Sequence, residues 1–270
     1  ARLRRFWKRP RVRIVFWAAL TGLLLGISGL GAPIEDGLRN IRWYVRMHPY
    51  HGNTIVVAQD DRTMSELGAS DVNRGTDAET LEQLFKAGAK RVLFDRSFTK
   101  RGNPDEAARF IETLKAHPGK VVLGALLTPN KGNYAGRLPI KEFREHAQVA
   151  SLVALHRPFN LGIRYPYSSN SPIGRIPSMS ALMAGVDGRP DELYFPDFST
   201  SLNSIPTLSY IDVMRGRFDP AQVRGKDVLI IPAAVTMNDF HTVPSQGITS
   251  PGGYFLVVGA ETLKRATPKD

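Results

Sequence analysis

The sequence predicts an α/β fold: a single three-layer domain around a mostly parallel sheet, preceded by one N-terminal transmembrane helix. Two observations lead to this prediction. From residue 54 onward, short apolar runs typical of buried strands alternate with amphipathic stretches, which is the pattern of a parallel sheet covered by helices. Before them, the 21 residues 14–34 carry no charge, and a helix of that length spans roughly 30 Å, the thickness of a hydrocarbon core.

The first 13 residues hold much of the positive charge of the chain. The formal charge is +11, and seven of the 36 lysines and arginines lie in residues 1–13, which contain no acidic residue. The remainder has 29 basic and 25 acidic side chains and no basic stripe interleaved with aromatic residues, so we expect no nucleic-acid partner. Since basic segments stay on the cytoplasmic side, we expect a cytoplasmic tail over 1–13, a transmembrane helix over 14–34 and an exported domain over 35–270.

The apolar run leaves three interpretations open. A buried helix of a soluble protein is one, and a cleaved signal peptide is another, because small residues follow the run. An uncleaved anchor in a lipid bilayer fits the length best, and it predicts the bacterial inner membrane with the main domain in the periplasm. Gly22 and Gly26 form a small-xxx-small pair, which predicts a homodimer contact between spanning helices, although glycine is also generally common in such helices.

The exported part is predicted to begin with a short helix and then to alternate. Residues 35–49 show apolar positions near helical spacing and end at Pro49. Continuous apolar runs then predict buried strands, and amphipathic stretches with capping residues or a Pro-Gly stop predict helices between them. The order is strand 55–58, helix 76–89, strand 91–95, helix 105–119 and strand 121–127.

The second half is less regular up to residue 206, where Gly, Pro, Ser and Asn are frequent. Weaker strands are predicted there at 151–155 and 193–195, with a helix at 178–184. After it, the pattern predicts a helix over 205–216, a buried strand within 225–235 and a closing helix over 254–265. No internal repeat or long linker divides this part, so one domain is expected.

Common catalytic and metal-binding patterns are missing from the sequence. It has no phosphate-binding loop, no G-x-G-x-x-G, no G-x-S-x-G and no H-E-x-x-H. The lack of cysteine excludes a thiolate zinc site and a cysteine nucleophile, and the six histidines are scattered. We therefore expect no catalytic residue, no metal and no cofactor.

Four aspartates follow predicted strands and could share one edge of the sheet. Asp60 and Asp61 come after the first strand, Asp95 ends the second, and Asp239 follows the strand near 225–235. The carboxyl ends of parallel strands usually line the ligand crevice, which predicts a polar or cation-binding pocket. The alternative is that these acids cap helices and fix loops. Adjacent strand residues point in opposite directions, so Asp60 and Asp61 are not expected to act as a catalytic pair.

Five segments in order, "TIVVAQDDRTMSELG", "GAKRVLFDRSF", "LSYIDVMRGRF", "VRGKDVLIIPAAVTMNDFHTVP" and "PGGYFLVVGAETL", resemble the CHASE type-two domain, an extracellular sensory module of bacterial membrane receptors. The resemblance covers about residues 35–266. Arg74, at the end of "ASDVNR", matches an arginine that the family has before its first helix, which adds it to the expected ligand-binding residues. Pro232 and "LVV" at 256–258 depart from the family pattern.

The resemblance implies a sensory input domain and no enzyme activity in this segment. Its stimulus would be a small molecule or an envelope signal, and the chain ends at "TPKD", where further membrane helices leading to an output domain are expected. Details such as "AETLKRA" resemble receptors that carry GGDEF and EAL domains, which make and degrade cyclic di-GMP. A membrane-tethered exported hydrolase and an envelope scaffold that binds a protein partner are the alternative functions.

Overall fold

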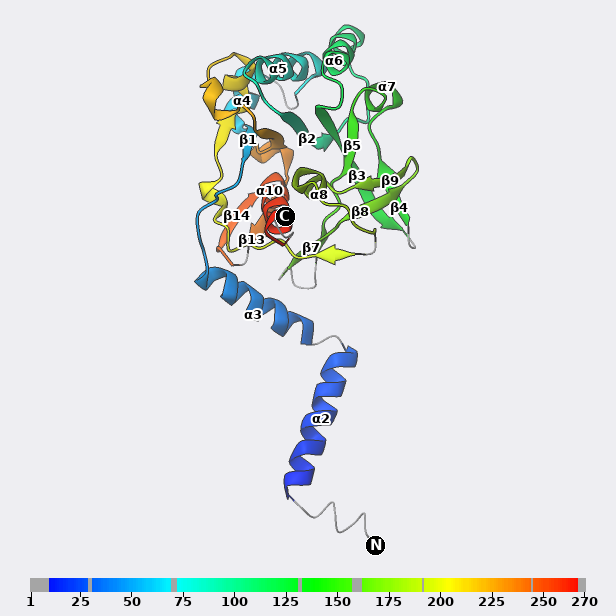
Figure 1. Ribbon diagram of the computed structural model, residues 1–270, viewed down its shortest axis with the longest axis vertical. Coiled ribbons are helices and arrows are strands. Elements are labelled where there is room, and N and C mark those ends of the chain that lie inside the picture. The colour runs from blue at the N-terminus through cyan, green and yellow to red at the C-terminus, as the bar shows by residue number, and fades with distance from the viewer. Residues whose placement is uncertain are drawn as a thin grey trace.

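The computed structural model describes residues 10–28, 31–68, 72–130, 133–156, 162–190, 192–243 and 245–266. The described part of the chain begins with two helices, α2 (Pro10–Ser28) and α3 (Gly31–Val45), which extend away from the body of the molecule (Figure 1). Most of the basic tail (1–9) and the segment "TPKD" (267–270) lie outside the described residues.

The predicted transmembrane segment 14–34 is divided between these two helices. α2 ends at Ser28, and residues 31–34 belong to the start of α3. In the described part of the chain, no helix is both long enough and apolar enough to cross a membrane. α2 carries Arg11 and Arg13 in its first turn, and α3 becomes charged from Glu35 onward, which limits the uncharged length within either helix.

Seven of the described strands form one sheet in the order β11-β1-β12-β2-β3-β4, with β5 also paired to β3. Every described pair in this sheet is parallel except β3 with β4, which confirms the prediction of a mostly parallel sheet. The strands are β1 (Thr54–Gln59), β2 (Arg91–Ser97), β3 (Val121–Asn130), β4 (Asn133–Arg137), β5 (Gln148–Ser151), β11 (Thr207–Ser209) and β12 (Asp227–Pro232).

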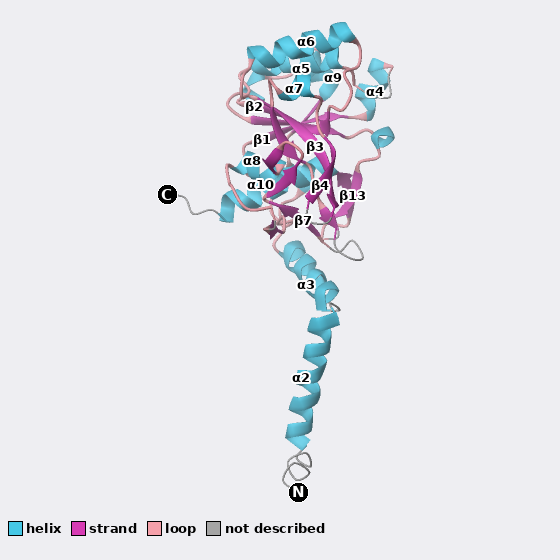
Figure 2. Ribbon diagram, turned by 90° about the vertical axis from the view of Figure 1, so that its right-hand side faces the viewer, coloured by secondary structure: helices cyan, strands magenta, loops and turns pink. Residues whose placement is uncertain are grey.

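Helices cover both faces of the sheet, as the side view shows (Figure 2). On one face lie α4 (Asp61–Leu67), α5 (Arg74–Lys86), α6 (Pro104–Ala116), α7 (Lys141–Arg144) and α9 (Tyr210–Met214); on the other lie α8 (Met179–Ala184) and α10 (Gly252–Ala266). Strand residues alternate between the two cores: Ile55 and Val57 pack in the core with α5 and α6, whereas Val56 and Ala58 pack in the core with α8 and α10. Burial on both faces explains why the strands read as continuous apolar runs.

Shorter strands form smaller sheets beside α8 and α10. They are β6 (Leu155–His156), β7 (Ile163–Pro166) and β10 (Leu193–Tyr194) in one sheet, β8 (Ser168–Ser171) with β9 (Gly174–Pro177), and β13 (Phe240–Val243) with β14 (Ile248–Pro251). Single-turn 3₁₀ helices, η2 (Leu202–Ser204), η3 (Pro220–Gln222) and η4 (Val235–Met237), complete the fold. The strand predicted near 193–195 and the helix predicted at 178–184 are thereby confirmed.

Three predicted elements differ from the structure. The helix expected over 205–216 is reduced to α9, because residues 207–209 pair with β1 as the edge strand β11. The strand expected at 151–155 lies earlier, as β5. α5 begins at Arg74 rather than Thr76, since the side chain of Asn73 accepts a hydrogen bond from the Thr76 amide at 2.8 Å and acts as the N-cap.

Candidate functional site

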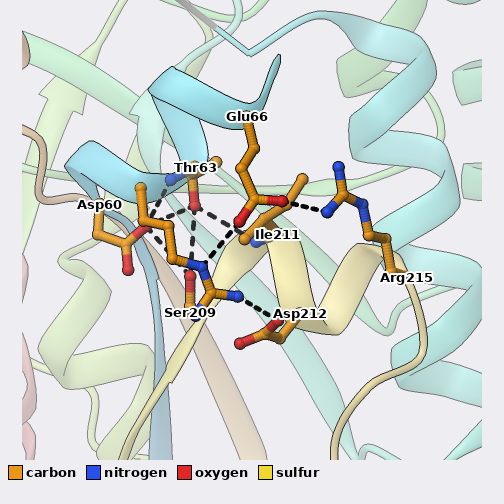
Figure 3. Close-up of polar contacts among 8 residues, drawn as sticks. Asp60, Thr63, Glu66, Ser209, Ile211, Asp212 and Arg215 are labelled. Atoms are coloured by element: carbon orange, nitrogen blue, oxygen red, sulfur yellow. Dashed lines mark hydrogen bonds and ion pairs between the residues drawn. The ribbon is translucent and has the colours of Figure 1, made fainter. Parts of the chain in front are cut away.

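Asp60 caps the N-terminus of α4. Its Oδ1 accepts hydrogen bonds from the Thr63 amide at 2.8 Å, the Thr63 hydroxyl at 2.6 Å and the Ser209 hydroxyl at 3.1 Å (Figure 3). These bonds join the end of β1, the start of α4 and the edge strand β11. These contacts are those of a helix cap that also fixes a loop, which is the alternative to a ligand-binding role for Asp60.

The same close-up shows how α4 is tied to α9. Arg62 donates to Glu66 at 2.9 Å and pairs with Asp212, and Arg215 pairs with Glu66 (Figure 3). These side chains lie at the surface, where individual ion pairs contribute little to stability. The cluster thus links two short helices through ion pairs that use the Glu66 and Asp212 carboxylates.

Replacing Asp60 with alanine is expected to lower the free energy of unfolding by about 0.5–2 kcal/mol, because the α4 amide loses its acceptor. Asp60→Asn keeps an acceptor oxygen and should retain most of that stability. Thermal unfolding of the two variants checks this. An equal loss in both would show that the negative charge of Asp60, and not the cap, is what matters.

Asp61 and Arg74 are also held by contacts within the protein. The exposed Asp61 carboxylate accepts a hydrogen bond from the Val235 amide at 2.9 Å, which links α4 to η4. Arg74 pairs with the buried Asp77 at 3.2 Å and stacks over the Phe98 ring at 4.4 Å, on the α5–α6 side of the sheet. Neither side chain lies beside Asp95 and Asp239.

Asp95 and Asp239, by contrast, line one cavity of about 270 Å³. Asp95 comes from β2, and Asp239 precedes β13. The walls are mainly apolar and come from β3, the segment after β5, β7 and α10: Leu126, Leu127, Leu152, Val153, Ala154, Ile163, Phe255 and Leu256. An apolar pocket with a few convergent polar groups is the usual form of a small-molecule site.

The order of the strands explains why the four aspartates do not form one rim. β12 lies between β1 and β2, so the ends of β1 and β2 are not neighbours. Asp60 and Asp61 therefore face the α4–α9 region, whereas Asp239 reaches Asp95 through the segment that follows β12. Asp95 and Asp239 therefore line the same cavity, whereas Asp60 and Asp61 accept hydrogen bonds from nearby backbone amides.

Two histidines and a tyrosine complete the polar part of the cavity. His241 on β13 lies 3.2 Å from Asp239, between its Nε2 and a carboxylate oxygen, and its ring lies 5.4 Å from that of His156. Burial, and then the neighbouring His241, lower the pKa of His156. Burial is also the main cause that raises the pKa of Tyr165 well above its ordinary value. His156 and Tyr165 have no sequence signal that we recognised.

The surroundings of Asp95 disfavour the charged form of its carboxyl group. Burial raises its pKa to about 8, and the negative charge of Asp239 adds to the effect. Its side chain is only partly buried, and no residue in the described ranges donates a hydrogen bond to its carboxyl group. Asp95 thus faces the cavity without a protein partner.

A glycine pair at the start of α10 makes this arrangement possible. A Cβ on Gly253 would lie 2.2 Å from Ile231 Cγ2 and 2.8 Å from Asp95 Oδ2, and one on Gly252 would lie 3.0 Å from Asp239 Oδ2. Only residues without a side chain allow α10 to approach β12 and both carboxyl groups so closely. Gly252 lines the cavity itself, and Gly253 allows the close approach of α10 to β12.

The donor set of the cavity suits binding more than metal chemistry. Within the ranges that the structure describes, no group of three or more His, Asp or Glu side chains is placed to hold a metal ion. The cavity offers two carboxyl groups, two imidazoles and an apolar wall, and none of its lining residues is a serine, threonine or lysine that could act as a nucleophile. These groups could bind a small ligand.

A family model described as CHASE2 domain matches residues 14–266. The match runs from within α2 to the end of α10 and includes the whole sheet and the cavity. It confirms the resemblance found from the sequence and extends it toward the N-terminus. No curated protein and no solved structure matches the chain.

Proposed function

The chain belongs to the CHASE2 domain family, whose members are extracellular sensory domains of signalling receptors, and we propose that it binds its stimulus in the Asp95–Asp239 cavity. The observation that carries this proposal is the unpartnered Asp95 carboxyl group on the wall of a mainly apolar cavity. The Asp95 side chain is partly buried, and a ligand that donates hydrogen bonds to it would supply the partner that the described protein residues do not. Binding sites commonly contain groups of this kind.

We further propose that the N-terminal helices hold the domain at the bacterial inner membrane, with the tail cytoplasmic and the body in the periplasm. α2 exposes large apolar side chains, among them Ile14, Trp17 and Leu23, each more than half exposed. α3 adds an exposed stripe of Ile34, Leu38, Ile41 and Val45. A lipid bilayer is a partner that would remove both surfaces from water.

The same helices are suited to pass a change in the body toward an output domain. α3 contacts the body through Arg39, whose guanidinium lies 3.7 Å from the centre of the Phe195 ring, and through Trp43, whose ring lies 5.6 Å from that of Phe198. Phe198 in turn contacts Phe255 of α10, a residue of the cavity wall, at 5.0 Å between ring centres. A ligand that moves Phe255 would therefore act on α3 through two aromatic contacts.

For the receptor as a whole we propose a homodimer with a cyclic di-GMP output of the GGDEF and EAL kind. Gly22 and Gly26 support the dimer, since a Cβ added at either would meet no described atom within 4 Å, which leaves room for a second helix. The proposed output rests on the segment "AETLKRA" at the end of α10, which resembles the corresponding part of receptors with GGDEF and EAL domains. Signalling then requires two states of the domain that bind the stimulus with different affinity.

The exported position can be tested with single cysteines, because the chain has none of its own. Glu112→Cys places a thiol on α6, where the Glu112 side chain is 72% exposed. In spheroplasts, a membrane-impermeant maleimide should label Glu112→Cys at once and Lys8→Cys, in the basic tail, only after lysis. Labelling of Glu112→Cys only after lysis would contradict the proposal.

A further inference from the structure

We propose that the Asp95–Asp239 cavity binds a small organic cation, namely a primary ammonium group that carries an apolar alkyl or aryl substituent. This inference rests on the proposed function, because it names the class of ligand for the same site. It follows from the charge of the cavity, from the free carboxyl group in it and from the nature of its walls.

The charge of the cavity selects a cation. Two carboxyl groups face it, and among the described residues that line it there is no lysine or arginine to neutralise them. His241 lies against Asp239, whereas Asp95 has no such neighbour. An ammonium group would favour the ionised form of both carboxyl groups, whereas an anionic ligand would oppose it.

Asp95 differs from Asp60, Asp61 and Asp77 in its contacts. Asp60 accepts from an amide and two hydroxyl groups, Asp61 accepts from an amide, and Asp77 pairs with two arginines. The partly buried Asp95 carboxyl group lines the cavity and receives no hydrogen bond from the described residues, so it is open to a donor from a ligand. A primary ammonium group brings three N–H donors and could bond to both carboxyl groups together.

The walls and the volume define the rest of the ligand. Leu126, Leu152, Phe255 and Leu256 offer an apolar surface beside the carboxyl groups. A volume of about 270 Å³ lies just below the range usual for drug-sized ligands, roughly 300–1,000 Å³. The cavity therefore suits one short alkyl chain or one aromatic ring attached to the ammonium group.

Binding of such a cation should release a proton. The pKa of Asp95 is raised to about 8, so its carboxyl group is largely protonated at neutral pH, and an adjacent ammonium group favours the carboxylate. The other titratable groups facing the cavity are Asp239 before β13, His241 on β13, His156 on β6 and Tyr165 on β7. Removal of Asp95 should therefore abolish most of the proton release.

The test uses the full chain and three probes of matched size: phenethylamine, 2-phenylethanol and phenylacetate. We expect phenethylamine to bind at least tenfold more tightly than either of the other two in calorimetric titrations at pH 7. Affinity should rise between pH 6 and pH 8, and titrations in two buffers of different ionisation enthalpy should show proton release. Asp95→Asn should weaken binding at least tenfold and abolish the release, whereas the control Glu112→Gln, on exposed α6, should change neither.

Phenethylamine binding no tighter than that of 2-phenylethanol, including no binding at all, would overturn the inference. Unchanged affinity in Asp95→Asn would overturn it as well. The maleimide labelling reports on the proposed function separately. Export without amine binding rejects only the ligand class, and amine binding by a domain found in the cytosol rejects only the receptor function.

Discussion

Replacing Asp77 with alanine is expected to destabilise the domain by about 3–5 kcal/mol, the usual cost of removing one partner of a buried ion pair. Asp77 lies on α5 and is fully buried. It pairs with Arg74 at 3.2 Å and with Arg96, and it accepts a hydrogen bond from the Tyr210 hydroxyl at 3.2 Å. Its removal leaves two largely buried arginines without their shared carboxylate.

Urea unfolding of the purified chain measures this loss, with Glu79→Ala as the matched control. Glu79 lies on the same helix and pairs with Arg109, but its side chain is 42% exposed, so its loss should cost no more than about 1 kcal/mol. Equal effects of the two substitutions would mean that the Asp77 cluster does not stabilise the core. Because Arg74 belongs to this cluster, the same result would also reopen its predicted role in ligand binding.

Asp95→Asn is expected to make the domain more stable than the wild type at pH 8 and equally stable near pH 4. The pKa of Asp95 is about 8 in the folded protein and near the ordinary 3.8 when unfolded, so between these values the folded state binds more protons. Stability from this group is therefore complete below the unfolded pKa and is lost as the pH rises toward 8, by up to about 1.4 kcal/mol per pH unit. Asparagine does not titrate, so the variant lacks this dependence of the unfolding free energy on pH.

Unfolding free energies measured between pH 4 and pH 9 test this prediction as a difference between variant and wild type. The other titrating groups are common to both proteins and cancel in the difference. Glu112→Gln, which removes an exposed carboxylate on α6, should give a curve parallel to the wild type. A parallel curve for Asp95→Asn would show that its carboxyl group is not enclosed.

Much of the fold could be predicted from local patterns, and the exceptions have physical reasons. β1, β2, β3 and β12 are continuous apolar runs because both faces of each strand are buried, and that pattern is visible in the sequence. β11 is only three residues long and exists because it pairs with β1, about 150 positions earlier. No local pattern contains such a pairing, so a helix was predicted there.

The candidate site could be predicted only in part, because the order of the strands in the sheet decides which of its residues lie together. Asp95 and Asp239 were placed at the same edge of the sheet, and they line one cavity. Asp60 and Asp61 were grouped with them because nothing in the sequence shows that β12 lies between β1 and β2. The close approach of Gly253 to Asp95 likewise depends on how α10 packs against β12.

The pKa of the Asp95 carboxyl group, measured by carbon-13 NMR in the full chain, tests most directly whether this group is enclosed and unpartnered beside Asp239. We expect a value of about 8 in the wild type and a lower value in Asp239→Asn, because the neighbouring negative charge is then absent. A pKa near the ordinary 3.8 in both proteins would contradict the assignment of this cavity as the ligand site.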